Sequence, residues 1–195
     1  MNLEKIFNFI KNKRNYNTPI KYKLLNNLPL TDDELIIDGD LDLEDENITT
    51  LPDNLYVGGF LDLKGTKIIT LPNNLKVGGF LDIRETNIKS LPNSLMVNSS
   101  LYASNTELET IPDNFKIPGS LNINGTLVSK LPDNLKVGLS LDIRDTTIKE
   151  IPNNLYIGQS FFLRDTPLAH EYTEEQLRKV IQNKNGNVKF KIYIS

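Results

Sequence analysis

The sequence contains no cysteine and no tryptophan, and it has a single histidine, His170. Without cysteine the chain cannot form a disulfide, a thiolate nucleophile, or a cysteine-ligated zinc or iron–sulfur site. One histidine cannot build a multi-histidine metal centre, and no nucleophile motif accompanies it to suggest a Ser–His–Asp triad. We therefore expect no enzyme, no catalytic residues, no cofactor and no metal.

Long hydrophobic runs are also absent from the sequence. No stretch approaches the roughly 18 apolar residues that a membrane span requires. The apolar stretch within residues 1–14 is too short and too interrupted by charge to resemble a secretory signal. With 38% hydrophobic and 24% charged residues, the composition is that of a soluble globular protein. These features predict an intracellular, cytoplasmic location.

A repeat of 20 residues dominates what the sequence does contain. Six of the ten prolines, from Pro52 to Pro152, are spaced 20 residues apart, and each belongs to a copy of the unit LPDNLYVGGFLDLKGTKIIT found at 51–70. A degenerate copy at 31–50 keeps the register, so the repeats form seven coils over 31–170. We number the positions of each coil from 1 to 20, with Leu51 at position 1.

Five positions of the coil, 5, 7, 11, 13 and 18, are apolar in all seven copies, and position 1 is apolar from Leu51 onward. Stacked coils could bury these side chains in one continuous core, which a single coil could not. The alternation of apolar and polar residues at 60–64 is typical of a strand. Threonine at position 16, as in Thr66, predicts hydroxyls bonded to the backbone of the same or the next coil. Glycine at position 8, as in Gly58, predicts a positive φ or a crowded backbone.

This pattern resembles the leucine-rich repeat family. Its motif L-x-x-L-x-L-x-x-N-x-L aligns with the segment from Gly58 through Leu61, Leu63 and Thr66 to Ile68, although glycine replaces the first leucine and threonine replaces the asparagine. The LPxNLxVGG form is also similar to uncharacterised bacterial and bacteriophage repeat proteins. The resemblance implies a right-handed parallel β-solenoid of leucine-rich repeat type, with small α/β terminal caps. Alternation at positions 5/7, 11/13 and 16/18 leaves a three-sided parallel β-helix as the alternative.

The two ends of the chain are predicted to cap the solenoid within a single domain. Residues 1–30 form a basic cap, with an amphipathic helix over 2–12 followed by irregular or extended chain. In residues 171–195, the capping box that begins at Thr173 predicts a helix, and alternation from Val188 to Ile194 predicts a final strand.

The outward-facing positions 10, 12 and 14 of the central strand form the candidate binding surface. We expect its aromatic side chains to be exposed, unless the N-terminal segment covers Phe60 and Phe80, and its aspartates to pair diagonally with basic residues of the adjacent column. Aromatic residues mixed with arginine are typical of interaction hot spots, and in leucine-rich repeat proteins this face usually binds the ligand. The predicted partner-binding residues are Phe60, Asp62, Phe80, Asp82, Arg84, Tyr102, Arg144, Phe162 and Arg164.

Charge is distributed unevenly along the chain. Residues 1–30 carry a net charge of +5, the coils at 31–170 carry −10 and the tail at 171–195 carries +2, for a total of −3. The acidic N-terminal half of the strand face favours a basic protein partner over nucleic acid or a membrane. The sequence therefore predicts a non-enzymatic protein-binding module, with a phage- or bacteria-encoded modulator as one such role. A carbohydrate-binding or polysaccharide-cleaving β-helix is the alternative, and the sequence predicts no oligomeric state.

Overall fold

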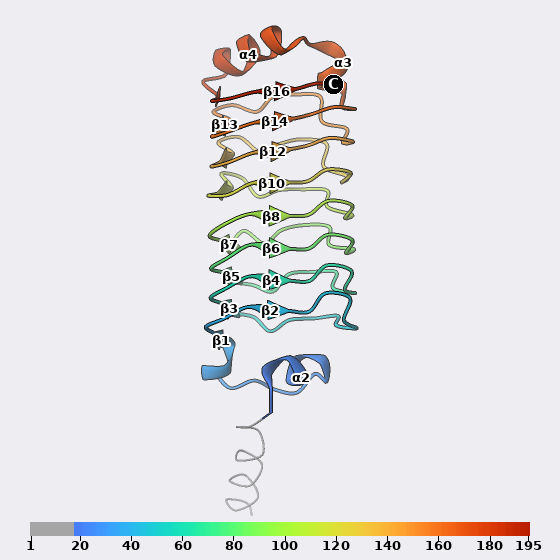
Figure 1. Ribbon diagram of the computed structural model, residues 1–195, viewed down its shortest axis with the longest axis vertical. Helices are drawn as coiled ribbons and strands as arrows, with labels where there is room; N and C mark the ends of the chain where they lie inside the picture. Colours follow the sequence, from blue (N-terminus) through green and yellow to red (C-terminus); the bar gives the residue numbers. More distant parts are fainter. Residues whose placement is uncertain (1–17) are drawn as a thin grey trace, which may run out of the picture.

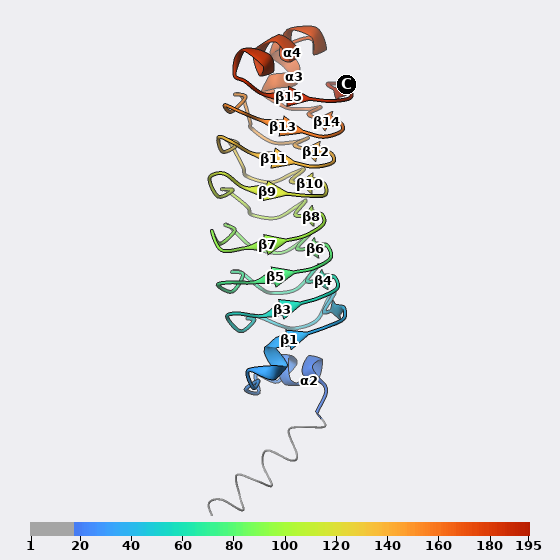
Figure 2. The same cartoon turned by 90° about the vertical axis from the view of Figure 1, so that its left-hand side faces the viewer.

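The chain forms a parallel β-solenoid, and the computed structural model describes residues 18–195 of it (Figure 1). The chain crosses the near face from left to right in both views while climbing toward its C-terminus, so the coil is right-handed (Figures 1 and 2). Each coil contributes two strands of two residues, one on each of two adjacent sides. The predicted solenoid of 20-residue coils with terminal caps is confirmed.

The first side carries a continuous sheet of eight parallel strands, which we call the front ladder (Figure 1). Its strands are, in order, β2 (Leu41–Asp42), β4 (Leu61–Asp62), β6 (Leu81–Asp82), β8 (Leu101–Tyr102), β10 (Leu121–Asn122), β12 (Leu141–Asp142), β14 (Phe161–Phe162) and β16 (Ile192–Tyr193). From β2 to β12 each strand pairs with the residues 20 positions ahead, as Leu41 does with Leu61, and Leu61 N–H donates to the carbonyl of Phe80 at 3.0 Å.

The second side carries the side ladder, which is divided into two sheets of four strands (Figure 2). The first sheet contains β1 (Ile36–Ile37), β3 (Tyr56–Val57), β5 (Lys76–Val77) and β7 (Met96–Val97). The second contains β9 (Lys116–Ile117), β11 (Lys136–Val137), β13 (Tyr156–Ile157) and β15 (Asn187–Val188). On the third side, positions 16–20 form one isolated bridge within the described residues, between Ser90 and Thr110. The third strand ladder expected of a β-helix therefore does not form there.

The core follows the six apolar positions, as the repeat predicts. Side chains at these positions are buried from the coil of Leu51 onward, and Leu61, Leu63 and Ile68 are completely inaccessible. In the first coil, Leu35 and Ile37 are only half-buried because no full coil lies beneath them. Every buried leucine of this kind contributes about 2 kcal/mol through removal of its surface from water, which makes the repeated columns the main source of stability.

The threonine column closes the turn after the front strand. Thr66 Oγ1 donates to the carbonyl of Leu63 at 2.7 Å, and the same bond, three residues back within the coil, recurs at every threonine of the column. The predicted backbone partner is thus confirmed, and it lies in the same coil. Because these hydroxyls are buried, leaving them unbonded would cost stability.

The position-8 glycines serve close packing between coils. A Cβ at Gly78 would lie 2.1 Å from the carbonyl oxygen of Gly58, and one at Gly138 would lie 2.0 Å from that of Pro118. The predicted crowding is therefore confirmed, whereas positive φ occurs at other positions. Those positions are 4 and 15, occupied for example by Asn54 at 62° and Gly65 at 68°.

The side ladder is divided where position 8 lacks glycine in two successive coils, at Asn98 and Pro118. Lys136 N–H donates to the carbonyl of Phe115 at 3.0 Å, but no corresponding bond joins Lys116 to Leu95. Proline also has no N–H with which to continue the ladder. The gap leaves a shallow groove of about 530 Å³ beside Met96 and Tyr156.

The N-terminal cap is described only from residue 18, so the helix predicted over 2–12 lies outside the described residues. A short helix, α2 (Ile20–Leu25), lies beneath the first coil, where irregular or extended chain was expected (Figure 1). A 3-10 turn, η1 (Asp33–Leu35), leads into β1. The buried Lys23 explains the ordered cap, because its ammonium binds Glu34 at 2.5 Å and thereby joins α2 to this turn.

The C-terminal cap contains two helices, α3 (Pro167–Glu171) and α4 (Glu174–Asn183), above the last coil (Figure 1). The predicted capping box at Thr173 is present, and Leu177 and Ile181 of α4 are buried. The predicted final strand is instead two strands, because the chain turns between β15 and β16 and adds one strand to each ladder. None of the helices in residues 18–195 is long and apolar enough to cross a membrane.

Candidate functional site

The front ladder places all nine predicted binding residues on one side of the solenoid, but in two separate groups. We call the first the N-terminal cluster, and it consists of Phe60, Asp62, Phe80, Asp82, Arg84 and Tyr102. The second, the C-terminal cluster, lies three coils further along and contains the predicted Arg144, Phe162 and Arg164. We include in it Asp142 and Tyr193, which were not predicted. Between the two clusters position 10 is serine, and Ser120 N–H donates to Ser100 Oγ at 3.0 Å.

Tyr193 is exposed, whereas Phe60, Phe80, Tyr102 and Phe162 are half-buried and so less exposed than expected. They shield one another: Phe60 and Phe80 stack with ring centres 4.9 Å apart, and Tyr102 meets Phe80 edge-on at 5.9 Å. The described part of the N-terminal cap lies below the first coil and is not what covers them (Figure 1). Stacking on successive strands fixes the orientation of the rings before any partner arrives.

Position 12 has a structural role that the strand pattern did not reveal. The side chain of Asp42 accepts a hydrogen bond from the N–H of Glu44 at 3.0 Å, and aspartate or asparagine at position 12 does the same in four further coils. Such a bond satisfies a backbone donor at the turn after the strand. The aspartate column is therefore more than a solvated strand face.

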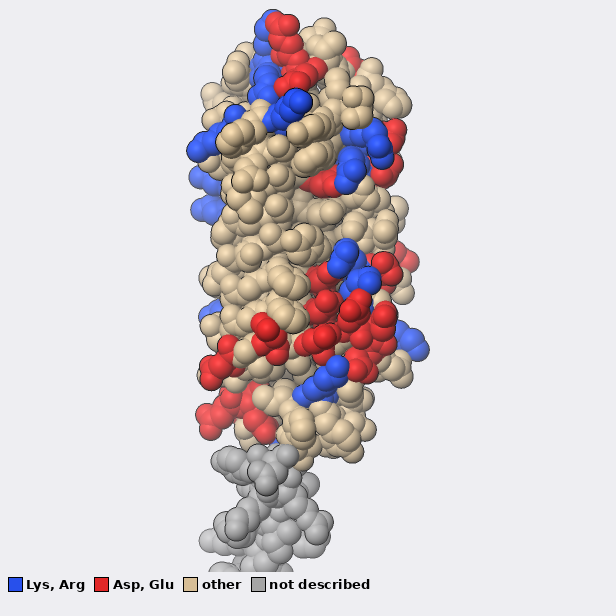
Figure 3. Space-filling model, viewed as in Figure 1, with Lys and Arg blue, Asp and Glu red and all other residues tan. Residues whose placement is uncertain are grey.

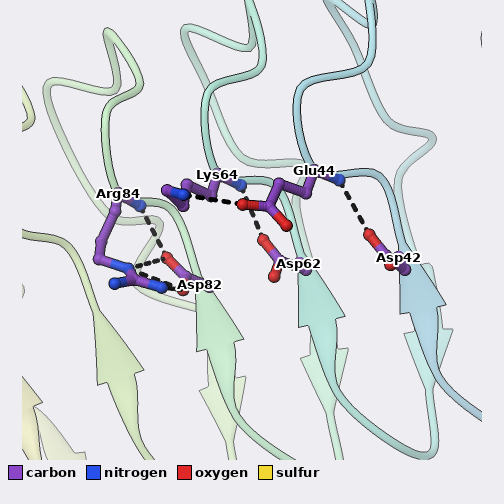
Figure 4. Close-up of polar contacts among 6 residues, drawn as sticks. All are labelled: Asp42, Glu44, Asp62, Lys64, Asp82 and Arg84. Atoms are coloured by element: carbon purple, nitrogen blue, oxygen red, sulfur yellow. Dashed lines mark hydrogen bonds and ion pairs between the residues drawn. The ribbon is translucent and has the colours of Figure 1, made fainter.

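Two arginines neutralise aspartates of their own coil, so the expected diagonal pairing is wrong for them. Arg84 binds Asp82 through Nε and Nη2, at 3.0 and 2.5 Å from the two carboxylate oxygens (Figure 4). Arg144 binds Asp142 in the same forked way, at 2.9 and 2.6 Å. Pairing within the coil is favoured because the two oxygens of one carboxylate accept hydrogen bonds from two nitrogens of the same guanidinium.

Each of these arginines also lies over an aromatic ring of the next coil. The guanidinium carbon of Arg84 is 5.9 Å from the centre of the Tyr102 ring, and that of Arg144 is 5.8 Å from the Phe162 ring. The pairing with aspartate buries Asp82 to 1% exposure. Arg164 differs, because it is exposed and its partner among the described residues is the neighbouring Asp165, at 3.0 Å.

Within residues 18–195, no arginine pairs with Asp62 in this way. The basic residue two positions later, Lys64, extends to Glu44 of the preceding coil, with an Nζ–Oε1 distance of 2.7 Å (Figure 4). Within the described residues, the hydrogen bond that the Asp62 carboxylate accepts comes from the Lys64 N–H at 2.9 Å. Burial and then the charges of Asp82, Glu44 and Asp42 raise the pKa of Asp62, against the lowering effect of that bond.

The two ends of the face differ in charge. Acidic side chains gather over the N-terminal coils, where few basic residues balance them (Figure 3). Near the C-terminal end, Arg144 and Arg164 lie on the face, and the Lys191 ammonium is 5.4 Å from the centre of the Tyr193 ring. The N-terminal cluster therefore offers aromatic surface beside uncompensated negative charge.

Tyr193 lies in the C-terminal cluster but was not among the predicted binding residues. It stacks on Phe162 with ring centres 4.6 Å apart and planes 6° from parallel. The residues of the two helices separate these partners by 31 positions instead of 20, so the repeat register does not align them. The available signal was the apolar alternation that ends in Ile192 and Ile194.

The structure places His170 in α3, within the C-terminal cap. Among the described residues, no group of three or more histidine or acidic side chains is arranged to hold a metal ion. Searches against protein-family models, curated proteins and solved structures found no match to this chain, which leaves its fold and surface as the basis for a functional proposal.

Proposed function

We propose that this protein is a non-enzymatic binding module that presents the front ladder to a basic protein partner. The observation that carries the proposal is the N-terminal cluster, where the stacked pair Phe60 and Phe80 lies beside the unneutralised carboxylate of Asp62. Aromatic side chains are enriched at the centres of protein interfaces. Negative charge at this end favours a partner of the opposite sign.

Rigid presentation is the proposed mechanism. The strands of the front ladder are about 4.8 Å apart, and Phe60, Arg84 and Arg144 are each held by a partner on their own or the next coil. Forming a complex then requires little additional ordering of the surface, which reduces the entropic cost of association. The stacked rings and the forked arginine–aspartate pairs are the groups that supply this order.

The resemblance to leucine-rich repeats supports the choice of surface, because the strand face is the usual binding side in that family. The same resemblance suggests a bacterial or bacteriophage repeat protein that acts by modulating its partner. These finer assignments belong to the proposal, whereas the parallel β-solenoid itself stands on the strand pairing.

Affinity capture with full-length protein tests the proposal. The variant Phe80→Ala/Arg84→Glu alters the front ladder, and Tyr56→Ala/Lys76→Glu is a matched control with an aromatic and a basic residue on the side ladder. We expect wild type and control to retain the same proteins and the front variant to lose them. Unchanged capture by the front variant would overturn the proposal.

Circular dichroism and thermal unfolding establish that both variants remain folded before capture is compared. Partners lost by the side-ladder variant alone would place the interaction on the other side of the solenoid. Salt dependence adds a second readout, because a complex formed through the acidic cluster should weaken as ionic strength rises.

A further inference from the structure

The front ladder shows twice how it binds a guanidinium group. Arg84 and Arg144 lie three coils apart, yet each forms a forked contact with the aspartate at position 12 of its coil and covers an aromatic ring of the next coil. The two sites therefore share one arrangement of carboxylate, guanidinium and ring. Planar, delocalised guanidinium groups suit this arrangement better than the compact ammonium of lysine.

The coil of Asp62 has the carboxylate of this arrangement without the arginine. Asp62 occupies position 12 and accepts the same backbone bond, from the Lys64 N–H at 2.9 Å, that Asp82 and Asp142 accept in their coils. Lys64 is directed to Glu44 and leaves the second carboxylate oxygen of Asp62 without a donor among the described residues (Figure 4). This carboxylate is thus available where the other two are occupied.

Aromatic surface also lies near Asp62, although it comes from position 10, whereas each internal arginine covers a ring at position 12 of the next coil. Phe60 precedes Asp62 by two residues and points to the same side of the ladder, and it stacks on Phe80 with the two planes 4° from parallel. The half-buried stack provides apolar surface beside the carboxylate. A guanidinium can pack against such a surface while its edge donates hydrogen bonds to a carboxylate.

We propose that the N-terminal cluster is an arginine-recognition site, in which Asp62 binds the guanidinium group of a partner protein beside the Phe60–Phe80 stack. This proposal rests on the proposed function and specifies the chemistry of the partner. The partner's arginine would supply the group that Arg84 and Arg144 supply in their own coils. Asp42 on the neighbouring coil reinforces the preference for a cation.

The raised pKa of Asp62 is consistent with this role. Bound guanidinium would favour the ionised carboxylate and lower that pKa, so arginine binding and proton release are linked. Affinity for arginine should therefore increase as pH rises through the titration range of Asp62 and become constant above it. A surface interaction that did not involve this carboxylate would lack that dependence.

Nuclear magnetic resonance on the full chain provides the test, with the end-blocked tripeptides Gly-Arg-Gly and Gly-Lys-Gly as probes at low salt. The Lys64 amide is the reporter, because it donates directly to Asp62 Oδ1. We expect the arginine peptide to shift this amide strongly and the lysine peptide to shift it weakly. The Arg144 amide serves as an internal reference, because the Asp142 carboxylate it contacts is already occupied.

The variant Asp62→Asn removes the charge while retaining the backbone bond, since Asn122 makes that bond in its own coil, to the Asn124 N–H at 3.0 Å. We expect this variant to bind the arginine peptide at least about tenfold more weakly, because a hydrogen bond to a charged acceptor is stronger than one to a neutral acceptor. Asp142→Asn is the matched control at the C-terminal cluster and should leave peptide binding unchanged.

Two results would overturn the arginine site. The first is no selective shift of the Lys64 amide with the arginine peptide, and the second is equal shifts in wild type and Asp62→Asn. Either result is distinguishable from failure of the proposed function, which depends on partner capture by the front ladder. Suppose that Phe80→Ala/Arg84→Glu loses its partners, whereas Asp62→Asn captures them and shifts with the arginine peptide as wild type does. The front ladder would then be supported as the binding face, and the arginine site would be rejected.

Discussion

The two ladders are built by the same coils, yet the front ladder continues through eight strands while the side ladder divides between β7 and β9. Both ladders have inward positions filled by apolar residues at that level, so hydrophobic content does not explain the difference. The difference lies at position 8, where Asn98 and Pro118 replace glycine in successive coils. The apolar positions of each coil thus set the register of the solenoid. The small residue at position 8 determines how closely the backbones of successive coils can approach on that side.

The largest expected effect comes from dividing the side ladder where it is now continuous. Gly78→Ala places a Cβ about 2.1 Å from the carbonyl oxygen of Gly58, so the backbone of one coil must move. We expect the free energy of unfolding to fall by about 2–3 kcal/mol, a cost typical of overpacked sites. Urea denaturation followed by circular dichroism measures this loss.

Gly39→Ala is the control for that substitution, because no atom lies within 4 Å of a Cβ built at Gly39. It should change stability by no more than a few tenths of a kcal/mol, in either direction. Equal losses in the two variants would mean that replacing glycine, and not contact between coils, determines the cost.

A somewhat smaller effect is expected when the turn behind the front ladder is altered. Thr86→Val keeps the shape of the side chain but removes the hydrogen bond from Oγ1 to the carbonyl of Ile83, at 2.7 Å. The buried carbonyl then loses a donor, which should lower the free energy of unfolding by about 1–2 kcal/mol. The exposed Thr147 next to the threonine column offers a control, and Thr147→Val should leave the urea midpoint nearly unchanged.

Joining the two sheets of the side ladder should change hydrogen exchange at the junction more than it changes the free energy of unfolding. In the double variant Asn98→Gly/Pro118→Gly, residue 118 gains an N–H and the crowding at position 8 is relieved. We expect hydrogen-exchange protection of the Lys116 amide to rise by about tenfold or more as its bond to Leu95 forms. The free energy of unfolding should change by less than about 1 kcal/mol, because added glycines increase the entropy of the unfolded chain.

Unchanged exchange at Lys116 in that double variant would show that position 8 does not cause the division. The amide of Lys136 is the internal reference, because it already donates to the carbonyl of Phe115 at 3.0 Å. Its protection should be the same in both proteins.

The sequence was sufficient to predict the coil, its inward positions and its threonine turns, because each of these depends on one column that repeats without change. It was insufficient for the outward face, where a side chain such as Arg84 can reach several carboxylates at similar distances. Its choice of Asp82 depends on bidentate geometry that no periodicity encodes. The stacking of Tyr193 on Phe162 was hidden because the helices of the cap interrupt the 20-residue register. Pro118, by contrast, was a visible departure within a glycine column and could have signalled the divided ladder.

The smallest expected effect concerns the charge that the front ladder leaves unbalanced at Asp62. Its pKa is raised in the folded protein, so the folded state retains the proton to higher pH than the unfolded chain does. Stability contributed by the protonated form is therefore present at low pH and lost as pH rises from the unfolded pKa through the folded pKa. Asp62→Asn should be more stable than wild type at neutral pH, by less than about 1 kcal/mol because the site is partly exposed and screened.

The opposite sign is expected at Asp142, and this contrast separates an unbalanced carboxylate from a paired one. Asp142→Asn removes the charge that Arg144 binds in a fork, so it should lower stability at neutral pH. Urea midpoints of wild type and both variants, measured between pH 3 and 7, give the comparison without requiring every carboxylate to be assigned. If Asp62→Asn destabilised the protein as Asp142→Asn does, Asp62 would already have a cationic partner within the chain, and the front ladder would have no vacant carboxylate to offer an arginine.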